Sequence, residues 1–205
     1  MDAMLKIHHV QGTRSMRVIW LCEELGVPYE IVPVDFSPEY RATPEWRALS
    51  PTGKVPVLSE GDFSMFESGA MVEYILERFG AGRLRPPLGT PDSAHYLQWS
   101  WFAEATLARP LGDIVHHTLL KPEAERIPAV VEDARERALT CLDGLETALE
   151  GKEFLLGDDF TAADIMMGYS LRLAQRMGVL VDDHPRVSEY FARLEARPAF
   201  QKSLA

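Results

Sequence analysis

The chain has little cysteine and no long run of apolar residues. Its two cysteines, Cys22 and Cys141, form neither a CxxC motif nor a metal-ligand spacing, so we expect small buried hydrophobes and no disulfide. No apolar stretch approaches the ~20 residues that a membrane span needs. Residues 1–6 lack the basic head and apolar core of a signal peptide. The sequence therefore favours a cytoplasmic protein without a membrane partner.

The chain also lacks an excess of positive charge. It carries 21 Lys and Arg against 31 Asp and Glu, which gives a formal net charge of −10. A nucleic-acid partner needs a basic face, so we expect no nucleic acid, and an anionic membrane surface is disfavoured for the same reason. No internal repeat or low-complexity segment is present. The apolar content of 46% is ordinary for a soluble globular protein.

The first eighty residues alternate between strand and helix patterns. We expect a strand over 5–10, a helix that ends before Gly26, and a strand over 29–34 that is buried on both faces. A short helix over 44–49, a hairpin of strands over 55–58 and 63–66, and a helix that starts close to Ser68 follow. This βαβαββα order predicts a small α/β unit with a right-handed parallel crossover.

Strand patterns disappear in the second half. Residues 81–91 hold three prolines and two glycines without periodicity, which indicates a linker. Helix patterns follow over 92–120, with a bend near Pro110, over 122–150, and over 186–196, where Pro198 ends the helix. We therefore expect an α/β domain over 1–80, a linker over 81–91 and an all-helical domain over 92–205.

A further helix is signalled by Thr161 and Asp164. A threonine followed three residues later by an acid resembles a capping box, with Asp in place of the usual Glu. We interpret this pair as a device that starts a buried helix, and not as catalytic machinery. Truncation of either residue is expected to cost about 1–2 kcal/mol of stability.

Two features of residues 55–68 are unusual for plain scaffolding. Pro56 lies inside a strand pattern, where a proline cannot donate to the ladder and leaves neighbouring backbone groups free to pair with another extended chain. The next helix begins with Glu67 and Ser68, and Ser68 is a good N-cap whose following amides can bind an anion. Together these groups would suit a zwitterionic amino-acid end continued by a short peptide, although plain helix capping is the alternative.

In this order and spacing, the features resemble the cytosolic glutathione transferases over the whole chain. The opening RSMRVIWLCEELG is most similar to the bacterial and fungal branch that carries a hydroxyl residue, rather than tyrosine, near the first helix. The motifs that carry the resemblance are SMRV at 15–18, EELGVPY at 23–29, GKVPVL at 53–58, Glu67-Ser68 and FTAAD at 160–164.

The resemblance implies a thioredoxin-like first domain that binds glutathione as co-substrate. Pro56 would then be cis, so that Val55 pairs with the cysteinyl backbone of glutathione. Ser68 would bind the γ-glutamyl carboxylate and Glu67 the amino group. Lys54 would approach the glycyl carboxylate, although an exposed loop lysine is an equal interpretation.

The catalytic group must stabilise the glutathione thiolate. Members of the serine type place a hydroxyl where Thr13 stands, and the extra methyl group of threonine crowds the sulfur. Ser15 is the second candidate, although it also suits a structural role at the helix start. A backbone amide or Arg14 is the third possibility.

The resemblance also implies a homodimer, a role in detoxification and a pocket for a small hydrophobic electrophile in the helical domain. We expect that pocket to include Trp101, Arg109 and His116. The histidines at 8–9 would point to opposite faces of a strand, and those at 116–117 would not share a face of a helix, so we assign no metal.

Three functions compete. The leading one is a glutathione transferase that adds the sulfur to the electrophile. The second is a glutathione-dependent disulfide or peroxide reductase, which needs only a stabilised thiolate. The third is a non-catalytic binding or assembly module of the same fold, because a fold does not guarantee activity.

Overall fold

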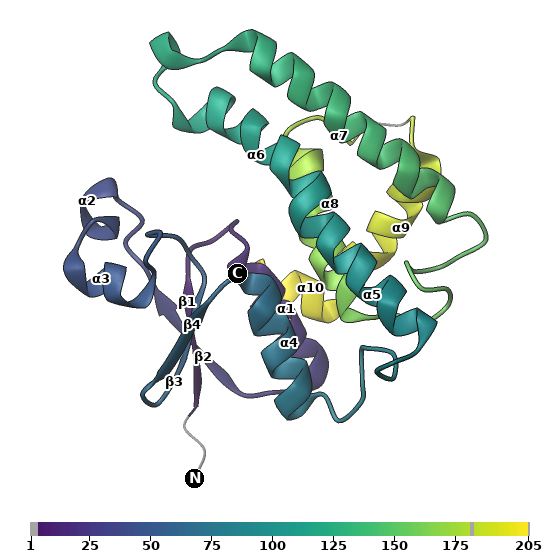
Figure 1. The fold of residues 1–205 in the computed structure, drawn as a ribbon, viewed down its shortest axis with the longest axis horizontal. Coiled ribbons are helices and arrows are strands. Elements are labelled where there is room, and N and C mark those ends of the chain that lie inside the picture. The colour runs from purple at the N-terminus through teal and green to yellow at the C-terminus, as the bar shows by residue number, and fades with distance from the viewer. Residues whose placement is uncertain (1–3, 181–182, 205) are drawn as a thin grey trace. The chain divides into compact units, whose positions relative to one another are not determined.

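The computed structural model describes residues 4–180 and 183–204. The first three residues of the expected first domain, and residues 181–182 and 205 of the expected second, lie outside them. The chain divides into two compact units, one made of the residues up to Arg83 with those from Arg197 on, the other of Leu84–Ala196 (Figure 1). The C-terminal residues thus group with the first unit, whereas the sequence pattern assigns all of 92–205 to the helical domain.

The first unit contains a four-stranded mixed sheet in the order β2–β1–β3–β4. β1 pairs in parallel with β2 and antiparallel with β3, and β3 forms the expected hairpin with β4. The predicted parallel crossover is thereby confirmed. The strands are β1 (Leu5–His9), β2 (Tyr29–Pro33), β3 (Val57–Glu60) and β4 (Phe63–Phe66).

Helices α1 (Ser15–Leu25) and α4 (Ser68–Phe79) pack against each other, as Figure 1 shows. α1 ends at Gly26, whose φ of 69° is the left-handed C-terminal cap that the sequence predicts. The short helix α3 (Pro44–Leu49) is confirmed, and the single turn α2 (Pro38–Arg41) before it was not predicted. Trp46 of α3 is buried with Val55 and Val57 in a small apolar cluster.

The expectation that β2 is buried on both faces is wrong. β2 lies at the edge of the sheet with β1 as its neighbour, and every residue in it is half-buried or exposed. Glu30 forms an exposed ion pair with Lys6 of β1 at 3.6 Å. An apolar run reports that a strand is hydrophobic, but not where the strand lies in the sheet order.

The C-terminal helix α10 (Pro198–Lys202) was not predicted either. Pro198 occupies the first position of this helix, where a missing N–H costs nothing, and thus does more than end the preceding one. The Phe200 ring packs edge-on against Trp20 of α1, with centroids 4.9 Å apart. The Arg197 guanidinium holds both carboxylate oxygens of Glu24 at 2.7 and 2.8 Å, which fixes the returning chain to α1.

The second unit is helical, and in its described residues no named strand occurs. No helix in the described ranges is long and apolar enough to cross a membrane. Its elements are α5 (Pro91–Trp101), η1 (Phe102–Leu107), α6 (Ala108–Val115), η2 (His116–Leu120), η3 (Glu123–Glu125), α7 (Pro128–Ala148), α8 (Ala162–Arg176) and α9 (Pro185–Glu195).

The long helix expected over 92–120 is present but leaves α geometry twice. η1 and η2 are π-helical, and η1 precedes Pro110. Pro110 has no N–H for the carbonyl of Thr106, which instead accepts a weak bond from the Cys141 thiol at 3.9 Å. The next helix, α7, starts at Pro128 and not at the expected Pro122, again with proline in the first position.

The predicted capping box at the start of α8 is confirmed. Asp164 is fully buried, and its carboxylate accepts hydrogen bonds from the Thr161 N–H at 2.8 Å and the Thr161 hydroxyl at 3.0 Å. The Leu155 N–H at 3.0 Å and the Tyr190 hydroxyl at 2.8 Å also donate to this carboxylate. Burial raises the pKa of this carboxyl, while the four donors act in the opposite direction. Asp164 therefore joins a loop, α8 and α9.

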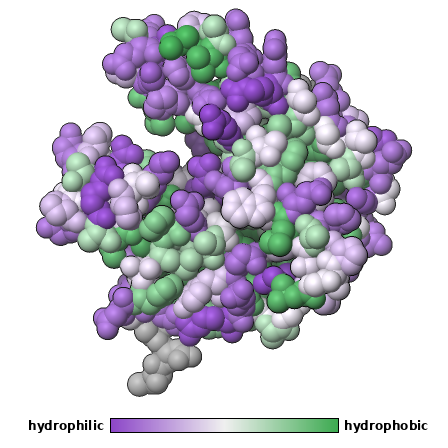
Figure 2. Space-filling model, in the orientation of Figure 1, coloured by the Kyte–Doolittle hydropathy of each residue, from purple (hydrophilic) through white to green (hydrophobic). Residues whose placement is uncertain are grey.

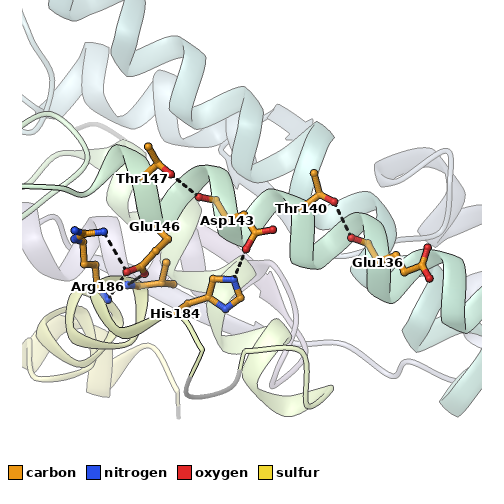
Figure 3. Close-up of polar contacts among 8 residues, drawn as sticks. Glu136, Thr140, Asp143, Glu146, Thr147, His184 and Arg186 are labelled. Atoms are coloured by element: carbon orange, nitrogen blue, oxygen red, sulfur yellow. Dashed lines mark hydrogen bonds and ion pairs between the residues drawn. The ribbon is translucent and has the colours of Figure 1, made fainter.

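Acidic residues of α7 hold the start of α9, as Figure 3 shows. The Glu146 carboxylate accepts the backbone N–H groups of Arg186 at 3.1 Å and Val187 at 3.0 Å, so it caps the first turn of α9. Asp143 contacts Nε2 of the buried His184 at 3.0 Å. These contacts fix α9 against α7 within the second unit.

Candidate functional site

Three loops of the first unit meet at one end of its sheet. His8 is paired with Val57, and Val57 with Phe66, so the end of β1, the start of β3 and the end of β4 lie side by side. The loops that continue from these points are 10–14, 50–56 and the junction between β4 and α4. Sequence reasoning selected its glutathione-site residues from these loops, and the strand register brings them together.

The Val55–Pro56 peptide bond is cis, as the sequence resemblance implied. Both residues are buried, but β3 begins only at Val57, so the expected start of the strand at Val55 is wrong by two residues. Within the described part of the chain, the Val55 backbone takes part in none of the turn, loop or cap hydrogen bonds. It therefore offers an N–H and a C=O beyond the end of the ladder.

The start of α4 differs from the expectation in one respect. Ser68 is the first helical residue and not the N-cap, a position that Glu67 occupies with φ 76° and ψ 105°. This left-handed conformation is costly for a residue other than glycine, and such strain is concentrated at functional sites. Glu67 is exposed, whereas Ser68 is only 3% exposed. The first amides of α4 point toward the N-terminal end of the helix, where an anion is stabilised.

Arg17 is a residue that sequence reasoning missed. It is fully buried on α1, and its Nη1 donates to the Ser68 hydroxyl at 3.2 Å. A buried guanidinium next to a helix N-terminus adds positive charge to a site already suited to an anion. The sequence held one signal for it: Arg17 lies on the same helix face as Leu21 and Leu25, where an apolar residue is expected, and a charged residue there indicates a buried polar role.

Lys54 is exposed at the end of a constrained loop. The buried Ser50 hydroxyl donates to the Lys54 carbonyl at 2.7 Å and accepts from its N–H at 2.9 Å. Gly53 has φ 67°, and a Cβ there would lie 2.9 Å from the Arg41 carbonyl oxygen and 3.1 Å from Cζ of Arg47. The loop therefore requires glycine, and the guanidinium of Arg47, which sequence reasoning did not select, packs against it next to Lys54.

Thr13 lies in the tight turn between β1 and α1. Its N–H donates to the Val10 carbonyl at 3.3 Å, and Gly12 supplies the φ of 77° that this turn needs. The Thr13 hydroxyl donates to the same carbonyl at 2.7 Å. Thr13 is half-buried, and its own carbonyl accepts the Met16 N–H of α1 at 3.2 Å. The hydroxyl therefore sits at the start of α1 with a fixed backbone.

Ser15 is fully buried, unlike Thr13. It is the first residue of α1, as anticipated, and its hydroxyl lies 2.7 Å from Nδ1 of His9 and 2.8 Å from Oγ1 of Thr13. The adjacent His8 contacts the Ser59 hydroxyl at 3.1 Å, which confirms that the two histidines point to opposite faces of the sheet. Burial, with a smaller effect of Lys6, lowers the pKa of His8.

The three candidates for the electrophile pocket lie in the second unit. Trp101 ends α5 and is 66% exposed, and Arg109 of α6 and His116 of η2 are exposed as well. Leu119 and Leu120, which follow His116 in η2, are exposed too. Figure 2 shows a group of strongly hydrophobic side chains at the top of the surface that it draws. A cavity of about 190 Å³ in the same unit is lined by other residues: Asp92, His95, Gln98, Trp99, Lys152, Leu155 and Leu156.

The potential metal ligands do not cluster within residues 4–180 and 183–204, and one of the two cysteines is buried. Among the described residues, no group of three or more potential metal ligands comes together. Cys22 is fully buried in α1, and burial, helped by Glu23, raises the pKa of its thiol to about 12. A thiol with this pKa is not a nucleophile at neutral pH.

Comparison with known proteins identifies the fold and its family. The family described as "Glutathione S-transferase, N-terminal domain" matches residues 4–77, and the family described as "Glutathione S-transferase, C-terminal domain" matches residues 128–193. Glutathione S-transferase 3 of Zea mays is 31% identical over 93% of this chain and 88% of its own length.

Solved structures agree with this result. A glutathione transferase of Phanerochaete chrysosporium, crystallised with oxidized glutathione, aligns with a TM-score of 0.87 at 28% identity over 99% of this chain and 94% of its own. The theta class glutathione S-transferase of Xanthomonas axonopodis pv. citri, with glutathione bound, aligns with a TM-score of 0.86 at 28% identity over 100% of this chain and 98% of its own. The thioredoxin-like fold with a helical C-terminal domain is thus confirmed, and the chain belongs to the glutathione S-transferase family.

Proposed function

We propose that this glutathione transferase binds glutathione in its first unit and adds the sulfur to a small hydrophobic electrophile. The observation that carries the proposal is the meeting of three groups at one end of the sheet. They are the cis Val55–Pro56 bond with the backbone of Val55, the N-terminus of α4 beside the buried Arg17, and the Thr13 hydroxyl. A peptide with an anionic head and a thiol meets a suitable group at each point.

Each part of glutathione has a proposed partner. The cysteinyl backbone pairs with the N–H and C=O of Val55 as an added strand. The γ-glutamyl carboxylate lies at the α4 amides and the Ser68 hydroxyl, and Glu67 binds the amino group. The glycyl carboxylate lies at Lys54, in the loop against which the guanidinium of Arg47 from α3 packs.

Thr13 is the proposed catalytic residue. Thr13 is half-buried next to the start of α1, where the positive end of the helix favours a thiolate. Ser15 is less suitable because it is fully buried and engaged with His9. The thiolate attacks an electrophilic carbon, a C–S bond forms, and the leaving group departs with the electron pair of its bond. Stabilising the thiolate supplies the nucleophile at neutral pH.

The electrophile is proposed to bind in the second unit at Trp101, Arg109 and His116. Support comes from their exposure and from the π-helical segments η1 and η2, since π-helical turns occur frequently at functional sites. The apolar side chains of Leu119 and Leu120 suit a hydrophobic substrate.

The proposal is tested by mixing the enzyme with glutathione. We expect thiolate ultraviolet absorbance at pH 7 and turnover of a chloronitrobenzene, both strongly reduced in Thr13→Ala. Thr140→Ala is the matched control, since Thr140 is an exposed threonine on α7 (Figure 3). Absence of glutathione binding by the wild-type protein would refute the proposal in favour of a non-catalytic module. An unchanged thiolate signal in Thr13→Ala would refute the role of Thr13.

A second candidate is a glutathione-dependent disulfide reductase. It is favoured by the similar Phanerochaete chrysosporium enzyme, whose structure holds oxidized glutathione. In that reaction the glutathione thiolate attacks one sulfur of a disulfide, a new S–S bond forms and the other thiolate leaves. Faster turnover of hydroxyethyl disulfide than of a chloronitrobenzene would favour this function.

We also propose a homodimer in the cytoplasm, with a detoxification role. The edge strand β4 exposes Phe63 at 44% and Phe66 at 41%, which are suitable anchors for a second copy. Both cysteines are free thiols, in keeping with a reducing compartment. Analytical ultracentrifugation should give a dimer for the wild type and a larger monomer fraction for Phe66→Ser. A monomeric wild type would contradict the dimer.

A further inference from the structure

A chain of hydrogen bonds connects the interior of the first unit to Thr13. Nδ1 of His9 lies 2.7 Å from the Ser15 hydroxyl oxygen, which lies 2.8 Å from the Thr13 hydroxyl oxygen. Thr13 in turn donates to the Val10 carbonyl at 2.7 Å. His9 is 8% exposed and Ser15 is fully buried, whereas Thr13 is half-buried. Thr13 is thus the outermost member of a buried polar chain.

The proton count limits how this chain can be arranged. Each hydroxyl has a single proton to donate. Thr13 gives its proton to the Val10 carbonyl, so it must release that carbonyl in order to donate to a sulfur. The carbonyl then retains the Thr13 N–H at 3.3 Å, while the single proton of the Ser15 hydroxyl is directed to Oγ1 of Thr13. The change therefore leaves no carbonyl unsatisfied.

We infer that His9, acting through Ser15, positions the Thr13 hydroxyl for donation to the sulfur of bound glutathione. The Nδ1–H of His9 donates to Ser15, and the Ser15 hydroxyl donates to Oγ1 of Thr13. An oxygen that accepts a hydrogen bond becomes a stronger donor through its own proton. No proton leaves His9 or Ser15. His9 and Ser15 are positioning residues, and this role rests on the proposed role of Thr13.

A purely structural role is the competing explanation. Ser15 begins α1, and His9 is a buried residue of β1, so the pair can serve packing alone. The two explanations differ in what a substitution changes. A structural role affects the binding of every glutathione derivative and does not require Thr13. A positioning role changes only the ionisation of the thiol, and only when Thr13 is present.

The readout is the pKa of the glutathione thiol in the complex, measured by thiolate absorbance as a function of pH. Ser15→Ala and His9→Leu should raise this pKa and leave about three- to tenfold less thiolate at pH 7, since they remove a relayed and not a direct donor. His9→Asn should recover most of the thiolate, because its amide N–H can occupy the place of Nδ1–H. S-methylglutathione, which has no thiol to ionise, should bind all variants equally.

The double variant Thr13→Ala/Ser15→Ala completes the test. If Ser15 acts through Thr13, the double variant should have the thiol pKa of Thr13→Ala alone. Additive effects, weaker S-methylglutathione binding, or an unchanged thiol pKa in Ser15→Ala would each overturn the inference. An unchanged thiol pKa in Thr13→Ala would instead refute the proposed function. His9→Asn and Ser15→Ala remain informative if His9→Leu does not fold.

Discussion

Replacement of Ser68 by alanine tests the anion site at the start of α4. Ser68 is 3% exposed, and its hydroxyl accepts a hydrogen bond from Nη1 of Arg17 at 3.2 Å, so the proton of that hydroxyl remains for a ligand carboxylate. A hydrogen bond to a charged group contributes about 1.5–3 kcal/mol, so Ser68→Ala should weaken glutathione binding by about 10- to 150-fold. The variant also loses an acceptor for Arg17, and its stability should fall by about 1–3 kcal/mol.

The assay is calorimetric titration with two ligands, glutathione and cysteinylglycine, which lacks the γ-glutamyl head. If Ser68 binds that head, Ser68→Ala and the wild type should bind the dipeptide equally, and only glutathione should distinguish them. Ser64→Ala is the matched control, because Ser64 is an exposed serine on β4. Glutathione binding within about twofold of the wild type, or an equal loss for both ligands, would refute the assignment.

Three further predictions concern stability and reactivity. Asp164→Asn replaces a carboxylate that accepts four hydrogen bonds by an amide with one acceptor oxygen, so the free energy of unfolding in urea should fall by about 3 kcal/mol. Glu146→Ala removes the acceptor for two amides of α9 and should cost about 1–2 kcal/mol in the same assay. Iodoacetamide at pH 8 should label the half-buried Cys141 before Cys22, because burial raises the pKa of Cys22 to about 12 and lowers its thiolate fraction about a thousandfold.

The controls follow from the same contacts. Glu136→Ala changes an exposed glutamate of the same helix as Glu146 and should leave the unfolding midpoint unchanged (Figure 3). If Asp164→Asn lowers the free energy of unfolding by less than about 0.5 kcal/mol, the stabilisation assigned to these hydrogen bonds is contradicted.

Folding raises the pKa of the Cys22 thiol, so the protonated thiol contributes its full stabilisation below the ordinary thiol pKa. This contribution is lost as the pH rises toward about 12. Equal labelling of both cysteines in the folded protein would contradict this assignment.

Sequence patterns predicted the features that depend on short stretches of chain. The end of α1 at Gly26, the capping box at Asp164 and the change of period at Ser68 are each set by residues within a few positions of one another. The cis bond before Pro56 came from a motif that the family shares. Local chemistry and motif order were therefore sufficient for the fold class and for a set of site candidates.

The features that were missed depend on partners far apart in the sequence. Arg17 is buried against Ser68, 51 positions away, and its place in the apolar stripe of α1 predicts burial but not this partner. The exposure of β2 follows from the order of strands in the sheet, which hydrophobicity does not encode. α10 has five residues, too few for a periodic pattern, and is held by Phe200 against Trp20. Long-range packing decided each of these points.

The return of the chain to α1 at Arg197 has a consequence for how the protein is made. The residues of the sheet and of α1 are translated long before Phe200, because the whole of Leu84–Ala196 must be translated in between. At ~5–20 residues per second, this interval is roughly 5 to 25 s. Throughout it, Trp20 has no Phe200 ring beside it and Glu24 has no guanidinium. The nascent first unit is therefore incomplete until Arg197 and Phe200 have been translated.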